Sequence, residues 1–100
     1  MNEQLKFRFT AYVAGDPGAS VFVNELRDAL KSSFGPGEWE LEIFNVLEVP
    51  EKALANDVFA TPTLVRSFPE PVLKVLANAA QIREVLLAIV DMQSATGDLV

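Results

Sequence analysis

The chain has 100 residues, of which 50% are hydrophobic and 22% are charged, and this length and balance fit one globular domain. Its net charge is −6 and its pI is about 4.5, which disfavours nucleic acid and anionic membranes as partners. It contains no cysteine and no histidine. That composition excludes a disulfide framework, a thiolate metal site and the commonest general base.

The N-terminus, Met1-Asn2-Glu3-Gln4-Leu5, lacks the apolar segment of a secretory signal. The longest apolar run, Val85 to Val90, is too short to span a bilayer. We therefore expect a cytoplasmic protein that does not interact with membranes. No spacing of carboxylates resembles a calcium loop, so we expect neither a metal site nor another cofactor.

The first half of the chain predicts a strand, a helix and a second strand. Apolar and polar side chains alternate from Lys6 to Val13, as in a strand with one buried face. Asp16 or Ser20 can cap the following helix, which Gly35-Pro36-Gly37 ends. The core stripe of that helix is Phe22, Leu26, Ala29, Leu30 and Ser33 or Phe34. The second strand runs from Trp39 to Leu47, and Glu38, Glu40 and Glu42 line one of its faces.

The second half predicts a short helix, a hairpin and a final helix. Pro50 suits the first turn of a helix from Glu51 to Asp57. Strands at Thr63 to Phe68 and Val72 to Leu76 flank the turn Pro69-Glu70-Pro71. A helix from Asn78, its expected cap, to Gln93 has a core stripe of Ile82, Val85, Leu86 and Ile89. Ser94 to Val100 is expected to be a frayed tail, so the core of this single domain is about 6–93.

The resulting order, β-α-β-α-β-β-α, is that of an α/β domain with a thioredoxin-like arrangement. Crossover helices predict parallel pairing among the first three strands, and the short proline turn predicts an antiparallel hairpin. Thioredoxin-like domains enter their third strand through a step like Thr61-Pro62-Thr63, where the proline is usually cis. Pro62 is thus a candidate cis proline. The alternative is an ordinary trans proline at the start of a strand.

Four motifs together resemble the landmarks of the KaiB family of circadian-clock proteins, in the family's order and spacing. They are Tyr12-Val13-Ala14-Gly15, Asn45-Val46-Leu47, Ala60-Thr61-Pro62-Thr63-Leu64 and Pro69-Glu70-Pro71-Val72. The resemblance implies a non-enzymatic regulatory protein that binds a KaiC-like ATPase. A KaiB-like sensor or stress-response module without clock function, serving a histidine kinase, is the alternative. The oligomeric state is left open between a monomer and a homo-oligomer such as a dimer or tetramer.

The resemblance also implies where a partner binds. By position in the family, the partner-binding residues are Val23, Asn24, Arg27, Glu40, Glu42, Val58 and Phe59. Family members often carry lysine at the place of Glu42 and before the Ala-Thr-Pro-Thr motif, where this chain has Val58-Phe59. Glu38, Glu40 and Glu42 on one face of the second strand suggest an acidic stripe that recognises a basic partner. The plainer explanation is solubility and protection of a sheet edge.

KaiB-like proteins are also known for fold switching, in which a tetrameric ground state has the order β-α-β-β-α-α-β. That fold would place a helix across Pro71–Leu76 and a strand within Val85–Val90. This chain replaces the family's usual Gly-Asp by Ala77-Asn78, which removes a backbone position with free access to positive φ. We therefore expect the thioredoxin-like state.

We predict no catalytic residue. Ser20 is the only candidate nucleophile in the loop where redox relatives carry cysteines, and no histidine is available to activate it. A helix cap is the simpler role for Ser20. A glutathione-transferase-like use of Ser20 or Tyr12 would require a cationic binding site for the peptide, for which the chain offers few residues.

Overall fold

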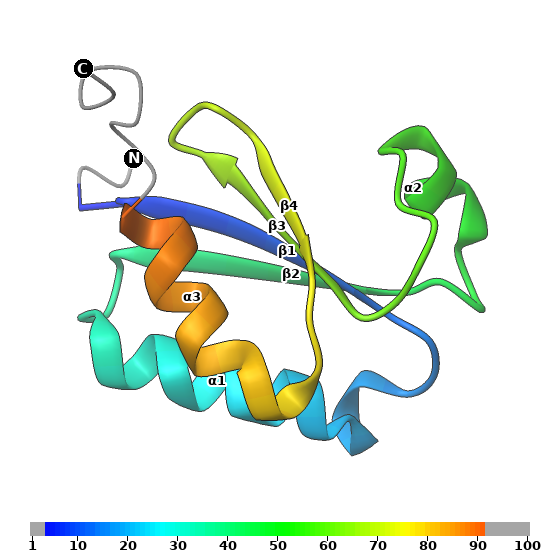
Figure 1. Ribbon diagram of the computed structural model, residues 1–100, viewed down its shortest axis with the longest axis horizontal. Coiled ribbons are helices and arrows are strands. Elements are labelled where there is room, and N and C mark those ends of the chain that lie inside the picture. The colour runs from blue at the N-terminus through cyan, green and yellow to red at the C-terminus, as the bar shows by residue number, and fades with distance from the viewer. Residues whose placement is uncertain (1–3, 92–100) are drawn as a thin grey trace.

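The computed structural model describes residues 4–91 of the chain (Figure 1). Its elements are β1 (Phe7–Val13), η1 (Pro17–Ala19), α1 (Val21–Ser33), β2 (Trp39–Asn45), α2 (Pro50–Ala55), β3 (Thr63–Phe68), β4 (Leu73–Leu76), η2 (Ala79–Gln81) and α3 (Ile82–Asp91). The predicted order of strands and α-helices is therefore confirmed. Val85–Val90 lies in α3 and Leu73–Leu76 is a strand, as expected for the thioredoxin-like state. The expected frayed tail lies outside the described residues.

The strands form one sheet in the order β2-β1-β3-β4. β1 pairs with β2 in parallel, from Phe7 opposite Trp39 to Val13 opposite Asn45. β3 runs antiparallel to β1, and β4 runs antiparallel to β3. The prediction of parallel pairing among the first three strands is therefore correct for β1 and β2 but wrong for β3.

Helix length explains the direction of β3. The 13 residues of α1 extend about 20 Å, which carries the chain back along the length of β1. The six residues of α2 extend only about 9 Å. The chain consequently stays at the end of the sheet where β2 finished, as Figure 1 shows, and β3 enters from that end.

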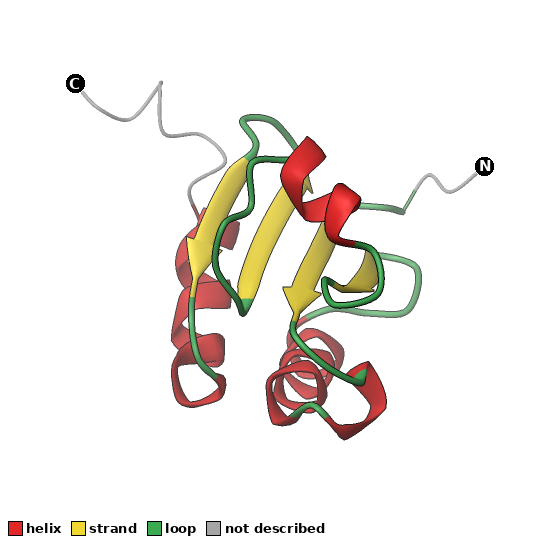
Figure 2. Ribbon diagram, turned by 90° about the vertical axis from the view of Figure 1, so that its right-hand side faces the viewer, coloured by secondary structure: helices red, strands yellow, loops and turns green. Residues whose placement is uncertain are grey.

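Both longer helices, α1 and α3, cover the same face of the sheet (Figure 2). The main core lies between them and the sheet, where Phe9, Leu26, Leu64, Ile82 and Leu86 are almost completely buried. Of the stripe expected on α3, Ile82, Leu86 and Ile89 are buried and Val85 packs partly against the core. The alternation of β1 and the stripes of both helices therefore position this layer as predicted.

The opposite face of the sheet, which we call the open face, is covered only at one end by α2 and the loop that follows it. A second cluster there joins Tyr12, Ala53, Val58 and Val65, with Phe44 and Val46 packed against it. The remainder of the open face carries polar side chains, including Arg8, Glu40 and Glu42. These residues lie away from both long helices.

Side-chain caps fix the helix starts. The Ser20 side chain accepts a hydrogen bond from the Val23 N–H at 3.1 Å, and Asp16 accepts one from the Gly18 N–H at 3.0 Å. The Asn78 side chain caps η2 and forms a reciprocal capping box with Gln81. The last helix therefore begins at the expected place, through a short 3-10 turn. Its predicted end at Gln93 lies outside the described residues.

Arg66 on β3 is completely buried, and it lies on the helix side of the sheet. Its Nη1 donates to the carbonyl of Ile89 in α3, and its Nη2 donates to the carbonyl of Pro71 at 3.1 Å. Its Nε has no hydrogen-bond partner. Burial lowers the pKa of the guanidinium. Arg66 thus connects β3 with both the hairpin and the last turn of α3.

Candidate partner-binding surface

Edge strand β2 presents two carboxylates on the open face. Trp39, Leu41 and Ile43 pack against the main core, so the alternate residues Glu40 and Glu42 lie on the other side of the sheet. Both glutamates are exposed. The parallel register places Glu40 beside Arg8 and Glu42 beside Thr10 on β1.

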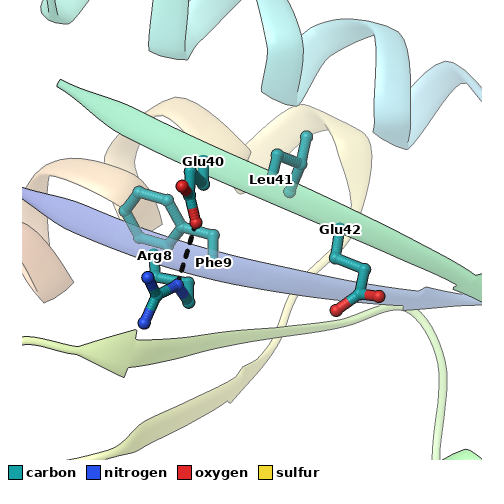
Figure 3. Close-up of a pocket in the computed structure, with 5 residues that line it drawn as sticks. All are labelled: Arg8, Phe9, Glu40, Leu41 and Glu42. Atoms are coloured by element: carbon teal, nitrogen blue, oxygen red, sulfur yellow. Dashed lines mark hydrogen bonds and ion pairs between the residues drawn. The ribbon is translucent and has the colours of Figure 1, made fainter. Parts of the chain in front are cut away.

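Glu40 and Glu42 differ in their contacts, although they are two residues apart. The Nε of Arg8 donates to Oε1 of Glu40 at 2.9 Å, and the two side chains are each 51% exposed (Figure 3). The ion pairs within residues 4–91 leave Glu42 without a cation. A hollow of about 420 Å³ is lined by Arg8, Phe9, Glu40, Leu41 and Glu42. Glu42 therefore brings an uncompensated negative charge to its rim.

Glu38 does not extend this acidic stripe. It precedes β2, and its Oε1 accepts a hydrogen bond from the Gly35 N–H at 2.8 Å. Its other carboxylate oxygen lies 3.4 Å from the Nζ of Lys6. The hydrogen bond from Gly35 is the main reason that the pKa of Glu38 is below 4.5; desolvation opposes it and Lys6 reinforces it. Glu38 holds the turn before β2, so the stripe consists of Glu40 and Glu42.

The loop after α2 supplies an exposed aromatic side chain. Phe59 is 80% exposed, whereas its neighbour Val58 is only 5% exposed and packs in the second cluster. The ring of Tyr12 in that cluster lies 5.6 Å from the ring of Phe44. Burial raises the pKa of the Tyr12 hydroxyl, and the negative charge of Glu42 raises it further. A hydrogen bond from Asn56 lowers this pKa by a smaller amount. Val58 thus anchors the loop while Phe59 remains available for contact.

Asn45 connects the loop after β1 with the loop after β2, and this role was not predicted from the sequence. Its Oδ1 accepts hydrogen bonds from the Gly15 N–H at 2.9 Å and from the Leu47 N–H at 3.0 Å. Gly15 has a φ of 121°, which side-chain-bearing residues rarely adopt. The presence of both residues in the sequence motifs was the available signal. The pairing itself spans 30 residues of the chain, so local pattern did not reveal it.

The Thr61–Pro62 peptide bond is cis, as are Phe68–Pro69 and Glu70–Pro71. The carbonyl of Pro62 accepts a hydrogen bond from the Ala77 N–H at 3.2 Å. The hydroxyl of Thr63 donates to the carbonyl of Ala60 at 2.5 Å. One bond connects the loop around Pro62 to the first residue of β3, and the other connects it to Ala77, just before the last helical segment.

The partner-binding residues expected from the sequence fall into separate groups. Asn24 and Arg27 are exposed on α1, on the opposite side of the sheet from Glu40 and Glu42. Phe59 is exposed in the loop after α2. Val23 is 2% exposed and belongs to the main core, and Val58 is buried in the second cluster. These two valines therefore support the surface from inside in this state and offer no contact area to a partner.

Within residues 4–91, no group of three histidine, cysteine, aspartate or glutamate side chains is placed to hold a metal ion. No helix in the described part of the chain is long and apolar enough to cross a membrane.

The sheet order, the helices on one face and the proline loop define a thioredoxin-like domain. In agreement, the structure is similar to the N-terminal domain of SasA from Synechococcus elongatus, with a TM-score of 0.74 and 16% identity over 96% of this chain and 90% of that one. It is also similar to chloroplastic thioredoxin z, with a TM-score of 0.59 and 20% identity over 87% of this chain and 80% of that one.

Sequence comparison gives the family. The model of the KaiB domain matches residues 10–92. The chain is 32% identical to the circadian clock oscillator protein KaiB of Prochlorococcus marinus strain NATL2A, over 89% of this chain and 83% of that protein. It is 29% identical to the protein of that name from Synechococcus sp. strain RCC307, over 89% and 81% of the two chains. The chain belongs to the KaiB family.

Proposed function

We propose that the protein is a non-enzymatic regulator of circadian-clock type that acts by binding a KaiC-like ATPase. Its relatives, which are named as circadian clock oscillator proteins, support the regulatory assignment. The observation that carries the binding proposal is the exposed carboxylate of Glu42. It lies on edge strand β2 at the rim of a hollow, and the ion pairs among the described residues do not include it. An unpaired charge at such a place suits a partner of opposite charge.

The contact surface is proposed to centre on Glu40, Glu42 and Phe59. An exposed aromatic ring is typical of an interface anchor, because burying the ring contributes much of the binding energy. Asn24 and Arg27 on α1 would extend the contact around the β2 edge. Val23 and Val58 would act indirectly, by holding α1 and the loop after α2 in position.

The partner is proposed to present basic side chains to β2. Glu42 stands where better-known family members often carry lysine. The partner residue that contacts Glu42 should therefore be basic, in contrast to the residue that would contact that lysine. The same observation favours one alternative, in which the protein serves a different partner such as a histidine kinase in sensing or stress response. In either case we propose action in the cytoplasm without catalysis, cofactor or bound metal.

The direct test is titration of the purified protein into the hexameric KaiC-like ATPase of the same organism, followed by calorimetry. We expect saturable binding that weakens as salt rises, since exposed charges are screened. Absence of binding by the folded protein, combined with capture of a histidine kinase from native extract, would replace the first function by the alternative. Thiol–disulfide exchange, glutathione conjugation or ATP hydrolysis by the purified protein would contradict the non-enzymatic assignment.

A further inference from the structure

A separate hollow of about 350 Å³ lies where α1 ends and β2 begins, lined by Lys31, Phe34, Pro36 and Trp39. Phe34 is the C-cap residue that follows Ser33 of α1, and Trp39 is the first residue of β2. Trp39 packs on the helix side of the sheet, so this hollow is distinct from the one beside Glu40 and Glu42. Its volume is at the lower end of the range for small-molecule sites.

The apolar wall of the hollow is fixed by the fold. Phe34 and Trp39 are partly buried against the main core, and the ring centroid of Phe34 lies 5.0 Å from that of Phe7. The turn between them is closed by a hydrogen bond from the Glu38 N–H to the Gly35 carbonyl at 3.1 Å. The Glu38 side chain accepts a second bond from the Gly35 N–H. An apolar ligand would thus meet a preformed surface with two aromatic rings.

The charged part of the lining is a cation. Lys31 is exposed in the last turn of α1, and the ion pairs within residues 4–91 involve Lys6, Arg8 and Arg83 but not Lys31. Arg27, one helical turn earlier, is also exposed and absent from those pairs. The nearby carboxylate of Glu38 is already occupied by Gly35 and Lys6. Lys31 is therefore the charged side chain that lines this aromatic hollow, and the exposed carboxylate of Asp28 lies one helical turn before it.

We propose that this hollow binds a small aromatic carboxylate. The aromatic ring would pack against Trp39 and Phe34, and the carboxylate would pair with the ammonium group of Lys31. A neutral ligand would lack the second contact, and a cation would be repelled by Lys31. This site is independent of the proposed partner-binding function, because it shares no lining residue with the hollow at Glu40 and Glu42.

Trp39 provides the measurement, because the chain has a single tryptophan. Phenylbutyrate and its neutral analogue phenylbutanol are titrated while the indole N–H signal of Trp39 is followed by NMR and its emission by fluorescence. We expect saturable changes, with phenylbutyrate bound about three- to fivefold more tightly than the alcohol, as suits one exposed charge pair. Equal affinities for the two probes, or an unchanged Trp39 signal at the highest soluble concentration of phenylbutyrate, would overturn the proposal.

Two lysine variants separate the site from general charge effects. Lys31→Gln should bind phenylbutyrate no better than phenylbutanol. Lys52→Gln removes an equal charge from α2, where Lys52 Nζ lies 5.7 Å from the ring centre of Phe44, and should leave both affinities unchanged. An equal loss of affinity in both variants would assign the effect to net charge and refute the role of Lys31.

Discussion

Glu40 and Glu42 show how nearby residues of one type can have different contacts. Glu40 has Arg8 as a partner, in an exposed pair of a kind that contributes at most about 1 kcal/mol to stability. Glu42 has no such pair within the described residues, so a partner protein would not need to break one. We therefore place the greater effect on binding at Glu42.

Glu42→Lys should weaken binding to a KaiC-like partner by about 1–3 kcal/mol, because it would set two cations against each other in the interface. Calorimetric titration of the variant measures the effect. Glu84→Lys is the matched control, since Glu84 is exposed on α3 on the other side of the sheet and should change affinity little. Unchanged affinity after charge reversal at both Glu40 and Glu42 would remove β2 from the interface.

Glu38 gives a prediction for acid. Its folded-state pKa is lowered from 4.5, mainly by the Gly35 N–H, so the folded protein binds protons less readily than the unfolded chain does. The stability that this group provides is present above its unfolded pKa and is lost as the pH falls through its folded pKa. Urea unfolding of wild type and Glu38→Gln should show a stability gap that narrows as the pH falls below 4.5. If the difference in unfolding free energy between the two proteins stays constant with pH, the hydrogen bond from Gly35 does not stabilise the charged form of Glu38 over its protonated form.

Among the elements, those with local signals were predictable and those set by distant contacts were not. The alternation of β1 and the caps Ser20 and Asn78 are visible in short stretches of sequence. The direction of β3 depended on α2 being too short to return along the sheet. Local sequence does not mark Arg66 as buried, since its hydrogen bond to the carbonyl of Ile89 spans 23 residues of the chain.

The same distinction applies to the candidate surface. The position of Glu40 and Glu42 on one face followed from the period of two in a strand. Val23 and Val58 were expected at the surface, and the structure buries both, because α1 and the loop after α2 turn these side chains toward the two clusters. Positions carried over from a family give candidate contact residues, whereas packing decides which of these side chains reach the surface.

Asn78 tests the start of the last helical segment. Asn78→Ala should lower the free energy of unfolding by about 1 kcal/mol, because it removes the bond to the Gln81 N–H at 3.0 Å and half of the capping box. Chemical denaturation measures this change. Asn78→Asp keeps an acceptor at the same place and should retain most of the stability. Equal losses in the two variants would mean that the cap bond contributes nothing.

At the scale of the whole molecule, the two sides of the sheet differ, because the long helices cover one side and the open face with Arg8, Glu40 and Glu42 lies on the other. Ala77 lies where the chain passes from β4 to the last helical segment, and it is only 3% exposed. Its N–H bonds to Pro62, so it connects that passage to the proline loop. The choice of the thioredoxin-like state should therefore be sensitive to this position.

Ala77→Gly should destabilise this state by about 0.5–1 kcal/mol, because glycine loses more backbone freedom on folding. Denaturant titration gives the change in stability, and size-exclusion chromatography with light scattering reports any tetramer. We expect the variant to raise a minor tetrameric population if one exists. A variant as stable as the wild type, with the same mass distribution, would show that Ala77 does not bias the fold.

Hydrogen exchange of the protein, alone and saturated with the KaiC-like ATPase of the same organism, tests the central claim most directly. The open face and its edge strand are proposed as the binding surface, so binding should slow exchange in β2 and in the loop that carries Phe59. The backbone of α3 should exchange as in the free protein. Protection confined to α3, with β2 and the Phe59 loop unchanged in a saturated complex, would contradict the account.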